Sequence, residues 1–197
     1  MAGYEYDFFI SYSRTGSVQK WLINHFYHKL VEYLADECAP APKVYMDRVM
    51  PRAVDWSHHL VNSLHRSKIM IQLMTPHYFE SGWCMAELES MRAREAVLGL
   101  ATADFPQGLV YPILYSDSHK FAVKERMRSW QDFKDYSYTE PVYQDAVEYI
   151  HFCRRVRELA RDLVELAQQV PPWSPDWPIV ERPEPVLIPP PPLPRFE

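Results

Sequence analysis

The sequence predicts an α/β fold in which a central parallel sheet of four to five strands lies between two layers of helices. Short segments of β-forming residues alternate along the chain with segments whose apolar residues recur every three or four positions. One β-forming segment, residues 68–75, is almost continuously apolar, which is typical of a central strand covered on both faces. This alternation indicates parallel strands joined by right-handed crossovers.

The expected strands are short, and polar or proline-containing segments separate them. Pro76 ends the most apolar one, because proline lacks the N–H that a strand would need next. A helical or irregular stretch from His119 leads to the weakest candidate. In chain order, the expected strands cover residues 6–12, 44–46, 68–75, 109–114 and, more weakly, 130–133.

Two amphipathic helices are expected between the first three strands. The first begins near Ser17, a plausible N-cap, carries apolar residues at helical spacing over residues 18–34, and ends before Pro40 and Pro42. The second follows the loop at residues 47–53, with Asp55 as its cap. Its expected apolar residues are Trp56, Leu60, Val61 and Leu64.

A third helix is expected to begin near Gly82 or Trp83. Trp83 and Glu87 lie at the border of its apolar stripe, and because they are four residues apart they share one face. The stripe consists of Cys84, Leu88, Met91 and Leu98. An exposed charged face is expected to carry Glu89, Arg92, Arg94 and Glu95.

The last part of the chain divides into a helix and a tail. Residues 141–170 carry an amphipathic pattern that predicts one helix of roughly 45 Å, part of it extending past the sheet. Residues 171–197 hold 11 of the 18 prolines and should form extended, polyproline-like chain. We therefore expect a domain over residues 1–170 and a proline-rich tail over 171–197. The apolar positions of the expected helix are Val147, Ile150, Cys153, Val156, Leu159, Leu163, Leu166 and Val170.

Composition excludes several classes of function. The formal charge of -5 and the scattered basic residues argue against nucleic-acid binding. The chain has no apolar run of the ~18 residues needed to cross a bilayer, and its start lacks the pattern of a signal peptide, so we expect a cytoplasmic protein. The three cysteines should be reduced thiols, and the eight histidines lack the spacing of a metal site.

Three loop segments should meet at one edge of the sheet. In open parallel sheets, ligands bind beyond the carboxyl ends of the strands. Residues 12–16, 47–53 and 76–87 all follow such ends. Taken singly, Trp83 could be an ordinary core residue and Glu87 an ordinary solvated one near a helix start, but together they could line one pocket.

At these positions the chain resembles a TIR (Toll/interleukin-1 receptor) domain, with an overall pattern closer to bacterial members. Residues 6–12 (YDFFISY) resemble the first box of the family, residues 44–47 (VYMD) its second strand, and residues 81–88 (SGWCMAEL) its WxxxE segment. The resemblance covers roughly residues 4–149 and implies a flavodoxin-like three-layer sandwich. The loop after the second strand departs from the family pattern, because Arg52 stands where glycine is usual.

The resemblance implies an NAD⁺ glycohydrolase that cleaves the bond between nicotinamide and ribose. Glu87 would be the catalytic residue; NAD⁺ would be the substrate, with no cofactor and no metal. A single carboxylate suits this reaction because nicotinamide leaves as a neutral pyridine and needs no general acid, so the site must mainly stabilise a ribosyl oxocarbenium ion. By resemblance, the substrate-binding residues would be Tyr12, Ser13, Arg14, Trp83 and Asp47.

Several aspects of the function stay open at the level of sequence. The products would be nicotinamide and either ADP-ribose or a cyclised form, and family members suggest a setting in bacterial antiphage immunity with activation by assembly into homo-oligomers. The alternative is a non-enzymatic TIR adaptor that acts only through association with other TIR domains. The proline-rich tail could dock on an aromatic groove of a separate sensor protein, or it could be a solvated end.

Overall fold

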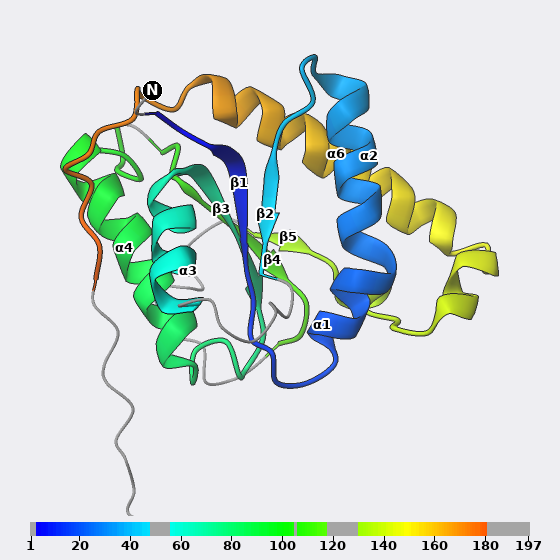
Figure 1. Cartoon of the computed structure of the whole chain (residues 1–197). Coiled ribbons are helices and arrows are strands. Elements are labelled where there is room, and N and C mark those ends of the chain that lie inside the picture. Colours follow the sequence, from blue (N-terminus) through cyan, green and yellow to red (C-terminus); the bar gives the residue numbers. More distant parts are fainter. Residues whose placement is uncertain (1–2, 48–55, 105, 118–129, 181–197) are drawn as a thin grey trace, which may run out of the picture.

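The computed structural model describes residues 3–47, 56–104, 106–117 and 130–180, and five parallel strands form its sheet (Figure 1). The order of strands across the sheet is β2-β1-β3-β4-β5. This is the parallel α/β architecture that the alternating pattern predicts. The strands are β1 (Tyr6–Ser11), β2 (Val44–Met46), β3 (Ser67–Met74), β4 (Val110–Leu114) and β5 (Gln131–Asp132).

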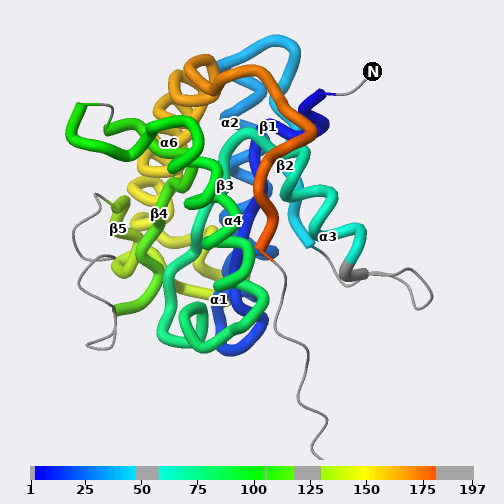
Figure 2. The backbone as a smooth tube through the Cα atoms, turned by 90° about the vertical axis from the view of Figure 1, so that its left-hand side faces the viewer, coloured from blue at the N-terminus to red at the C-terminus, as the bar shows by residue number. Residues whose placement is uncertain are grey.

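Helices cover both faces of the sheet, as Figures 1 and 2 show. On one face lie α1 (Val18–Trp21), α2 (Tyr27–Glu37) and α6 (Tyr149–Gln168), and on the other lie α3 (Trp56–His65) and α4 (Gly82–Leu98). Side chains of a strand alternate between its faces. Phe8 and Ile10 of β1 accordingly pack into the core beneath α1, α2 and α6, whereas Phe9 packs into the core beneath α3 and α4.

The strand register places the carboxyl ends of three strands side by side. Ile10 of β1 pairs with Met46 of β2 and with Ile71 of β3. The segments that follow these strands therefore leave the sheet at the same edge. The structure thus confirms the meeting of the loops for the described residues; residues 48–53 and Asp55, the expected cap, lie outside them.

The first predicted helix differs from the expectation in two ways. It contains a π-helical segment, η1 (Leu22–Phe26), between α1 and α2. Ser17 is the N-cap residue, as expected, but its side chain accepts no hydrogen bond from a backbone N–H of the helix. The Ser17 hydroxyl instead lies 2.8 Å from the hydroxyl of Tyr115, beyond the end of β4, and this tertiary hydrogen bond takes the group away from the helix.

A long C-terminal helix is present as expected, but it does not span residues 141–170 as one helix. A short 3₁₀ helix, η3 (Pro141–Asp145), comes first, Ala146 has an extended backbone, and α6 then spans 20 residues, about 30 Å. The break lets the ring of Tyr143 pack at 5.1 Å from that of Tyr149 and at 5.5 Å from that of His25. Consequently two residues expected to face the core, Val147 and Ile150, are 74% and 54% exposed.

Part of the expected charged face of α4 is buried. Arg94 and Glu95 are almost fully inaccessible, which contradicts the expectation for these two residues. The carboxylate of Glu95 accepts hydrogen bonds from the backbone N–H groups of Leu109 and Val110, at 2.7 and 3.1 Å. The Arg94 guanidinium donates to three backbone carbonyls, the nearest being that of Ser67 at 2.8 Å.

The start of the predicted tail lies against α3 and α4. Residues 171–180 contain no helix or strand, as expected, and Figure 2 shows them passing beside both helices. Trp173 Nε1 donates to the carbonyl of His65 at 3.2 Å, and the N–H of Val180 donates to Ser90 Oγ at 2.9 Å. The ring of Trp177 lies 5.4 Å from the Arg94 guanidinium. The rest of the tail, residues 181–197, lies outside the described residues.

Two expectations from composition can be compared directly with the structure. All three cysteines are free thiols, and Cys84 is buried in the core as expected. Among the described residues, no helix is both long enough and apolar enough to cross a membrane.

Candidate active site

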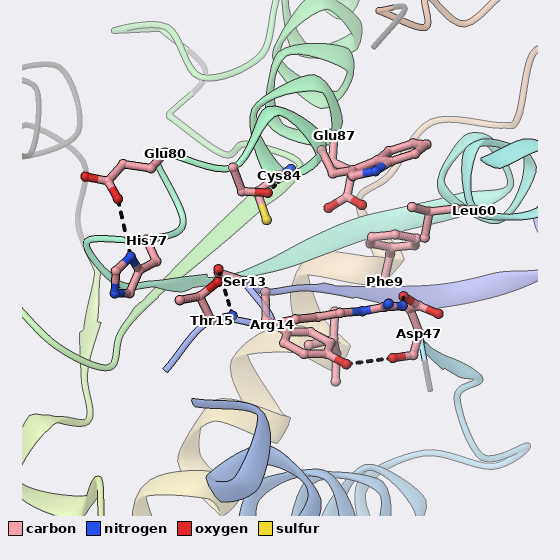
Figure 3. Close-up of a pocket in the computed structure, with 14 residues that line it drawn as sticks. Phe9, Ser13, Arg14, Thr15, Asp47, Leu60, His77, Glu80, Cys84 and Glu87 are labelled. Atoms are coloured by element: carbon pink, nitrogen blue, oxygen red, sulfur yellow. Dashed lines mark hydrogen bonds and ion pairs between the residues drawn. The ribbon is translucent and has the colours of Figure 1, made fainter. Parts of the chain in front are cut away.

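A cavity of about 470 Å³ opens at the carboxyl ends of β1, β2 and β3 (Figure 3). The loop after β1 and the residue after β2 form one wall, and the turn after β3 with the start of α4 forms the other. Its size is in the range of small-molecule sites. All six residues that the sequence suggested for the site line this cavity, namely Tyr12, Ser13, Arg14, Asp47, Trp83 and Glu87.

Glu87 lies in the second turn of α4, and its side chain is directed into the cavity (Figure 3). The residue is only 8% exposed. Ser11 Oγ, at the end of β1, lies 2.5 Å from Glu87 Oε2. A carboxyl group so enclosed by protein is costly to ionise.

Burial raises the pKa of Glu87 from its ordinary value of 4.5 to about 8. The hydrogen bond from Ser11 opposes this rise, the charge of Asp47 adds to it, and the charge of Arg14 reduces it. The carboxyl is therefore mostly protonated in the free protein at neutral pH. A cation that enters the cavity would favour the ionised form, because opposite charges lower the pKa of an acid.

The start of α4 fixes the positions of Trp83 and Glu87. Ser81 caps the helix, its Oγ accepting a hydrogen bond from the Cys84 N–H at 3.4 Å. Trp83 is partly buried and packs on the edge of the core beneath α4, one helical turn before Glu87. Burial raises the pKa of the Cys84 thiol to about 12, so this sulfur is a poor nucleophile at neutral pH.

An ion pair joins the two strand ends on the opposite wall. Arg14 Nη2 contacts Asp47 Oδ2, and the Arg14 side chain is 47% exposed whereas that of Asp47 is largely buried. The Tyr12 hydroxyl donates to the backbone carbonyl of Asp47 at 2.6 Å. These contacts hold the loop after β1 against the end of β2, and Arg14 also lines the cavity.

Ser13 is buried at the base of the loop after β1. Its hydroxyl accepts a hydrogen bond from the N–H of Thr15 at 3.2 Å, which stabilises a tight turn at the cavity wall. The side chain therefore has a structural partner as well as a place in the cavity lining.

Sequence reasoning led to the edge of the sheet where the cavity lies, but not to every lining residue. His77 and Glu80, in the turn after β3, also line the cavity (Figure 3). His77 Nδ1 lies 3.3 Å from Glu80 Oε2. Both belong to the segment 76–87 expected at this edge, yet the sequence carries no motif that singles them out. Phe9 and Leu60 add an apolar surface to the cavity. Of the two, only Phe9 could be assigned a side of the sheet from the sequence, because side chains alternate between the two faces of a strand.

Metal binding finds no support among the described residues, where no group of three or more His, Cys, Asp or Glu side chains is arranged to hold an ion. The cavity instead combines one enclosed carboxyl group, an ion pair and an indole. Such a combination suits an organic ligand that carries both a cationic ring and anionic groups.

Comparison with known proteins identifies the family. The sequence model of the TIR domain matches residues 8–144, more than half of the chain. No curated protein matches the chain. Among solved structures, the chain is similar to the TIR domain of a Toll-related receptor from Hydra magnipapillata, with 18% identity, a TM-score of 0.47, and coverage of 77% of this chain and 98% of that one. It is also similar to the TIR domains of the activated Roq1 resistosome that recognises the pathogen effector XopQ, with 16% identity, a TM-score of 0.40, and coverage of 84% and 96%. On the match to the family model, the chain belongs to the TIR domain family.

Proposed function

We propose that this TIR domain is an NAD⁺ glycohydrolase that cleaves the bond between nicotinamide and ribose. The observation that carries the proposal is the enclosed carboxyl group of Glu87, which faces a cavity of about 470 Å³ that also holds Trp83 and Arg14. Burying a carboxyl group without a cationic partner is unfavourable. Binding of a cationic ligand beside Glu87 would offset this cost.

The ionised form of Glu87 is the active one in this proposal. Burial holds the pKa of Glu87 near 8 in the free protein. The nicotinamide ring of NAD⁺ carries a positive charge, so its approach lowers this pKa and favours loss of the Glu87 proton to solvent. The carbon–nitrogen bond then breaks, its electron pair stays on the nicotinamide nitrogen, and positive charge develops on the ribosyl group. The fixed carboxylate stabilises that charge within an enclosed site.

The second half of the reaction needs only water. Water attacks the ribosyl carbon, the new carbon–oxygen bond forms, and the released proton passes to the Glu87 carboxylate before leaving for solvent. The products are nicotinamide and ADP-ribose. Capture of the cation by a group of the nucleotide itself would instead give a cyclic ADP-ribose-type product.

The other lining residues would bind the rest of the substrate. Trp83 would stack on the nicotinamide ring, an interaction worth on the order of 1 kcal/mol. Arg14, half exposed at the cavity, would contact phosphate oxygens through its guanidinium fork. Asp47 would keep Arg14 oriented, while Tyr12 and Ser13 shape the wall.

The cellular role stays a proposal that follows from the family resemblance. We propose that the protein acts in the cytoplasm as an effector of antiphage immunity, that association with further copies activates it, and that a separate sensor protein binds the proline-rich tail. A non-enzymatic adaptor that uses the same surfaces only to associate is the alternative.

Nicotinamide release separates the enzyme from the adaptor. Concentrated protein is incubated with NAD⁺, and nicotinamide is measured for the wild type, Glu87→Ala and Glu87→Gln. The matched control is Glu89→Gln, which removes a surface carboxyl from the same helix, where Glu89 pairs with Arg92. We expect release by the wild type and the control only. No release at any concentration, or release that survives both Glu87 substitutions, would reject the proposal.

A further inference from the structure

Two buried hydroxyl groups lie directly behind Glu87, and neither lines the cavity. Ser11, at the end of β1, and Tyr78, in the turn after β3, are almost fully inaccessible. Ser11 Oγ lies 2.5 Å from Glu87 Oε2 and 2.9 Å from the Tyr78 hydroxyl. The Tyr78 hydroxyl in turn lies 3.3 Å from the carbonyl oxygen of Cys84 in the first turn of α4. A continuous chain of oxygen atoms thus runs from the carboxyl group into the protein.

The ionised form of Glu87 fixes the direction of the hydrogen bond from Ser11. A carboxylate accepts hydrogen bonds but cannot donate one. The Ser11 O–H must therefore point at Glu87, and the Ser11 oxygen is then free to accept from Tyr78. In this state the Tyr78 hydroxyl can donate to Ser11, which at 2.9 Å is a nearer acceptor than the Cys84 carbonyl at 3.3 Å.

The protonated form of Glu87 permits the opposite arrangement. A carboxylic acid can donate its proton to the Ser11 oxygen, the Ser11 O–H can then donate to Tyr78, and the Tyr78 O–H can donate to the Cys84 carbonyl. Tyr78 keeps its own proton throughout, because burial raises the pKa of its hydroxyl well above the ordinary value. No buried hydroxyl loses its partner in either state, which avoids the cost of an unpaired polar group.

We infer that Ser11 and Tyr78 form a reversible hydrogen-bond relay that positions Glu87 and keeps it paired in both of its protonation states. The inference rests on the proposed function, in which the carboxyl loses and regains a proton in each turnover. Ser11 and Tyr78 touch no substrate, since neither faces the cavity, so they are positioning residues.

Other titratable and charged groups surround the Glu87 carboxyl and also influence its pKa. Arg14 and Tyr12 approach from the loop after β1, and Tyr45 and Asp47 approach from β2 and its end. Cys84 approaches from α4 and Tyr78 from the turn after β3. Arg14 and Asp47 form an ion pair, and their charges shift the pKa of Glu87 in opposite directions. In the part of the chain that the structure describes, the Ser11 hydroxyl is the group that hydrogen-bonds directly to the carboxyl.

The relay is tested by the titration of Glu87 itself in the full-length protein without NAD⁺. Carbon-13 NMR follows two signals, that of the Glu87 carboxyl carbon and that of the backbone carbonyl carbon of Cys84. The Glu87 signal is assigned by its loss in Glu87→Gln. In the wild type, we expect both signals to titrate with one midpoint. Ser11→Ala should raise the carboxyl midpoint by about one pH unit, a tenfold change in the ionisation constant, because it removes a donor to the charged form.

Tyr78→Phe provides the sharper test. The relay predicts that the signal of the Cys84 carbonyl no longer shifts with the ionisation of Glu87 in this variant, because phenylalanine has no hydroxyl proton to redirect. A carbonyl that merely senses the nearby charge through space would titrate as before, and that result would overturn the inference. An unchanged Glu87 midpoint in a folded Ser11→Ala protein would overturn it as well.

Matched controls separate the relay from general effects of removing buried hydroxyls. Ser67→Ala changes a buried serine at the opposite end of the sheet, and Tyr143→Phe removes a buried hydroxyl on the opposite face. Neither should move either midpoint. If Ser11→Ala does not fold, Ser11→Cys keeps the shape with a weaker donor and should raise the midpoint by a smaller amount; no rise in that variant would overturn the inference.

The same variants distinguish failure of the relay from failure of the proposed function. The relay predicts that the acid limb of kcat/KM for nicotinamide release moves with the Glu87 midpoint in Ser11→Ala, so that activity lost at pH 7 recovers at higher pH. Signals that behave as predicted in a protein that never releases nicotinamide would reject the enzymatic role of the relay. Nicotinamide release with an unmoved midpoint would reject the relay and leave the proposed function intact.

Discussion

Glu87 should make a contribution to the stability of the protein that falls with rising pH, and Glu87→Gln should remove this contribution. Burial raises the pKa of Glu87 in the folded state to about 8, whereas the unfolded chain should have the ordinary value near 4.5. The folded state therefore binds the proton more tightly. This contribution to stability is fully present below pH 4.5 and is lost as the pH rises through about 8.

The magnitude follows from the distance between the two pKa values. At 1.36 kcal/mol per pH unit, the wild type should lose on the order of 4 kcal/mol of unfolding free energy, relative to Glu87→Gln, between about pH 4.5 and 8. Glutamine has nearly the same shape and is neutral, so its amide does not titrate, and its carbonyl oxygen can still accept the hydrogen bond from Ser11.

Urea denaturation at several pH values from 4 to 9 provides the measurement, with Glu89→Gln as the control for removal of one carboxyl from α4. We expect the stability difference between Glu87→Gln and the wild type to be small near pH 4 and to grow in favour of the variant as the pH rises. A constant difference would show that folding leaves the pKa of Glu87 unchanged, and a wild type that gains relative stability with pH would show that the folded protein stabilises the carboxylate. Either result would refute our account of the site.

Three further substitutions test other parts of the structure. Arg14→Ala should raise the KM for NAD⁺ about tenfold with a smaller effect on kcat, because the guanidinium binds a part of the substrate that does not react, and steady-state kinetics would check this. Trp177→Ala should lower the unfolding free energy by about 3 kcal/mol, because it uncovers Arg94, and Trp177→Phe should cost less; urea denaturation compares the two. Glu95→Ala should cost about 2 kcal/mol or more in the same assay, because it leaves two backbone N–H groups at the start of β4 without their acceptor; a loss below 0.5 kcal/mol would contradict this role.

The sequence was sufficient for the sheet and for the edge that holds the cavity. Both follow from local patterns: strand segments such as residues 68–75 are short and apolar, and the spacing of Trp83 and Glu87 already puts them on one helical face. The rule that loops after parallel strands meet at one edge then brings Arg14, Asp47 and Glu87 together.

The remaining features depend on contacts between residues that are distant in the chain. The break between η3 and α6 places Tyr143 against His25, which lies in the π-helical segment η1. The burial of Arg94 depends on Trp177 of the tail. No local pattern encodes either pairing, and the helical periodicity of residues 141–170 even argued against the break.

The hydrogen bond from Ser11 to Glu87 belongs to the same class. It joins the end of β1 to the second turn of α4, and the tertiary fold brings Ser11 Oγ to 2.5 Å from Glu87 Oε2. The sequence could nominate Glu87 from a motif, but it could not reveal how the carboxyl is enclosed or that its pKa is raised. Those properties arise from tertiary packing.

The pH dependence of kcat/KM for nicotinamide release tests the central claim most directly, because this quantity reports the ionisation of the free enzyme. We predict a rate that rises with pH through an apparent pKa near 8, and no nicotinamide release by Glu87→Gln at any pH. A rate that is flat from pH 5 to 9, or one that falls as the Glu87 proton is lost, would contradict the claim that an enclosed carboxylate performs the reaction.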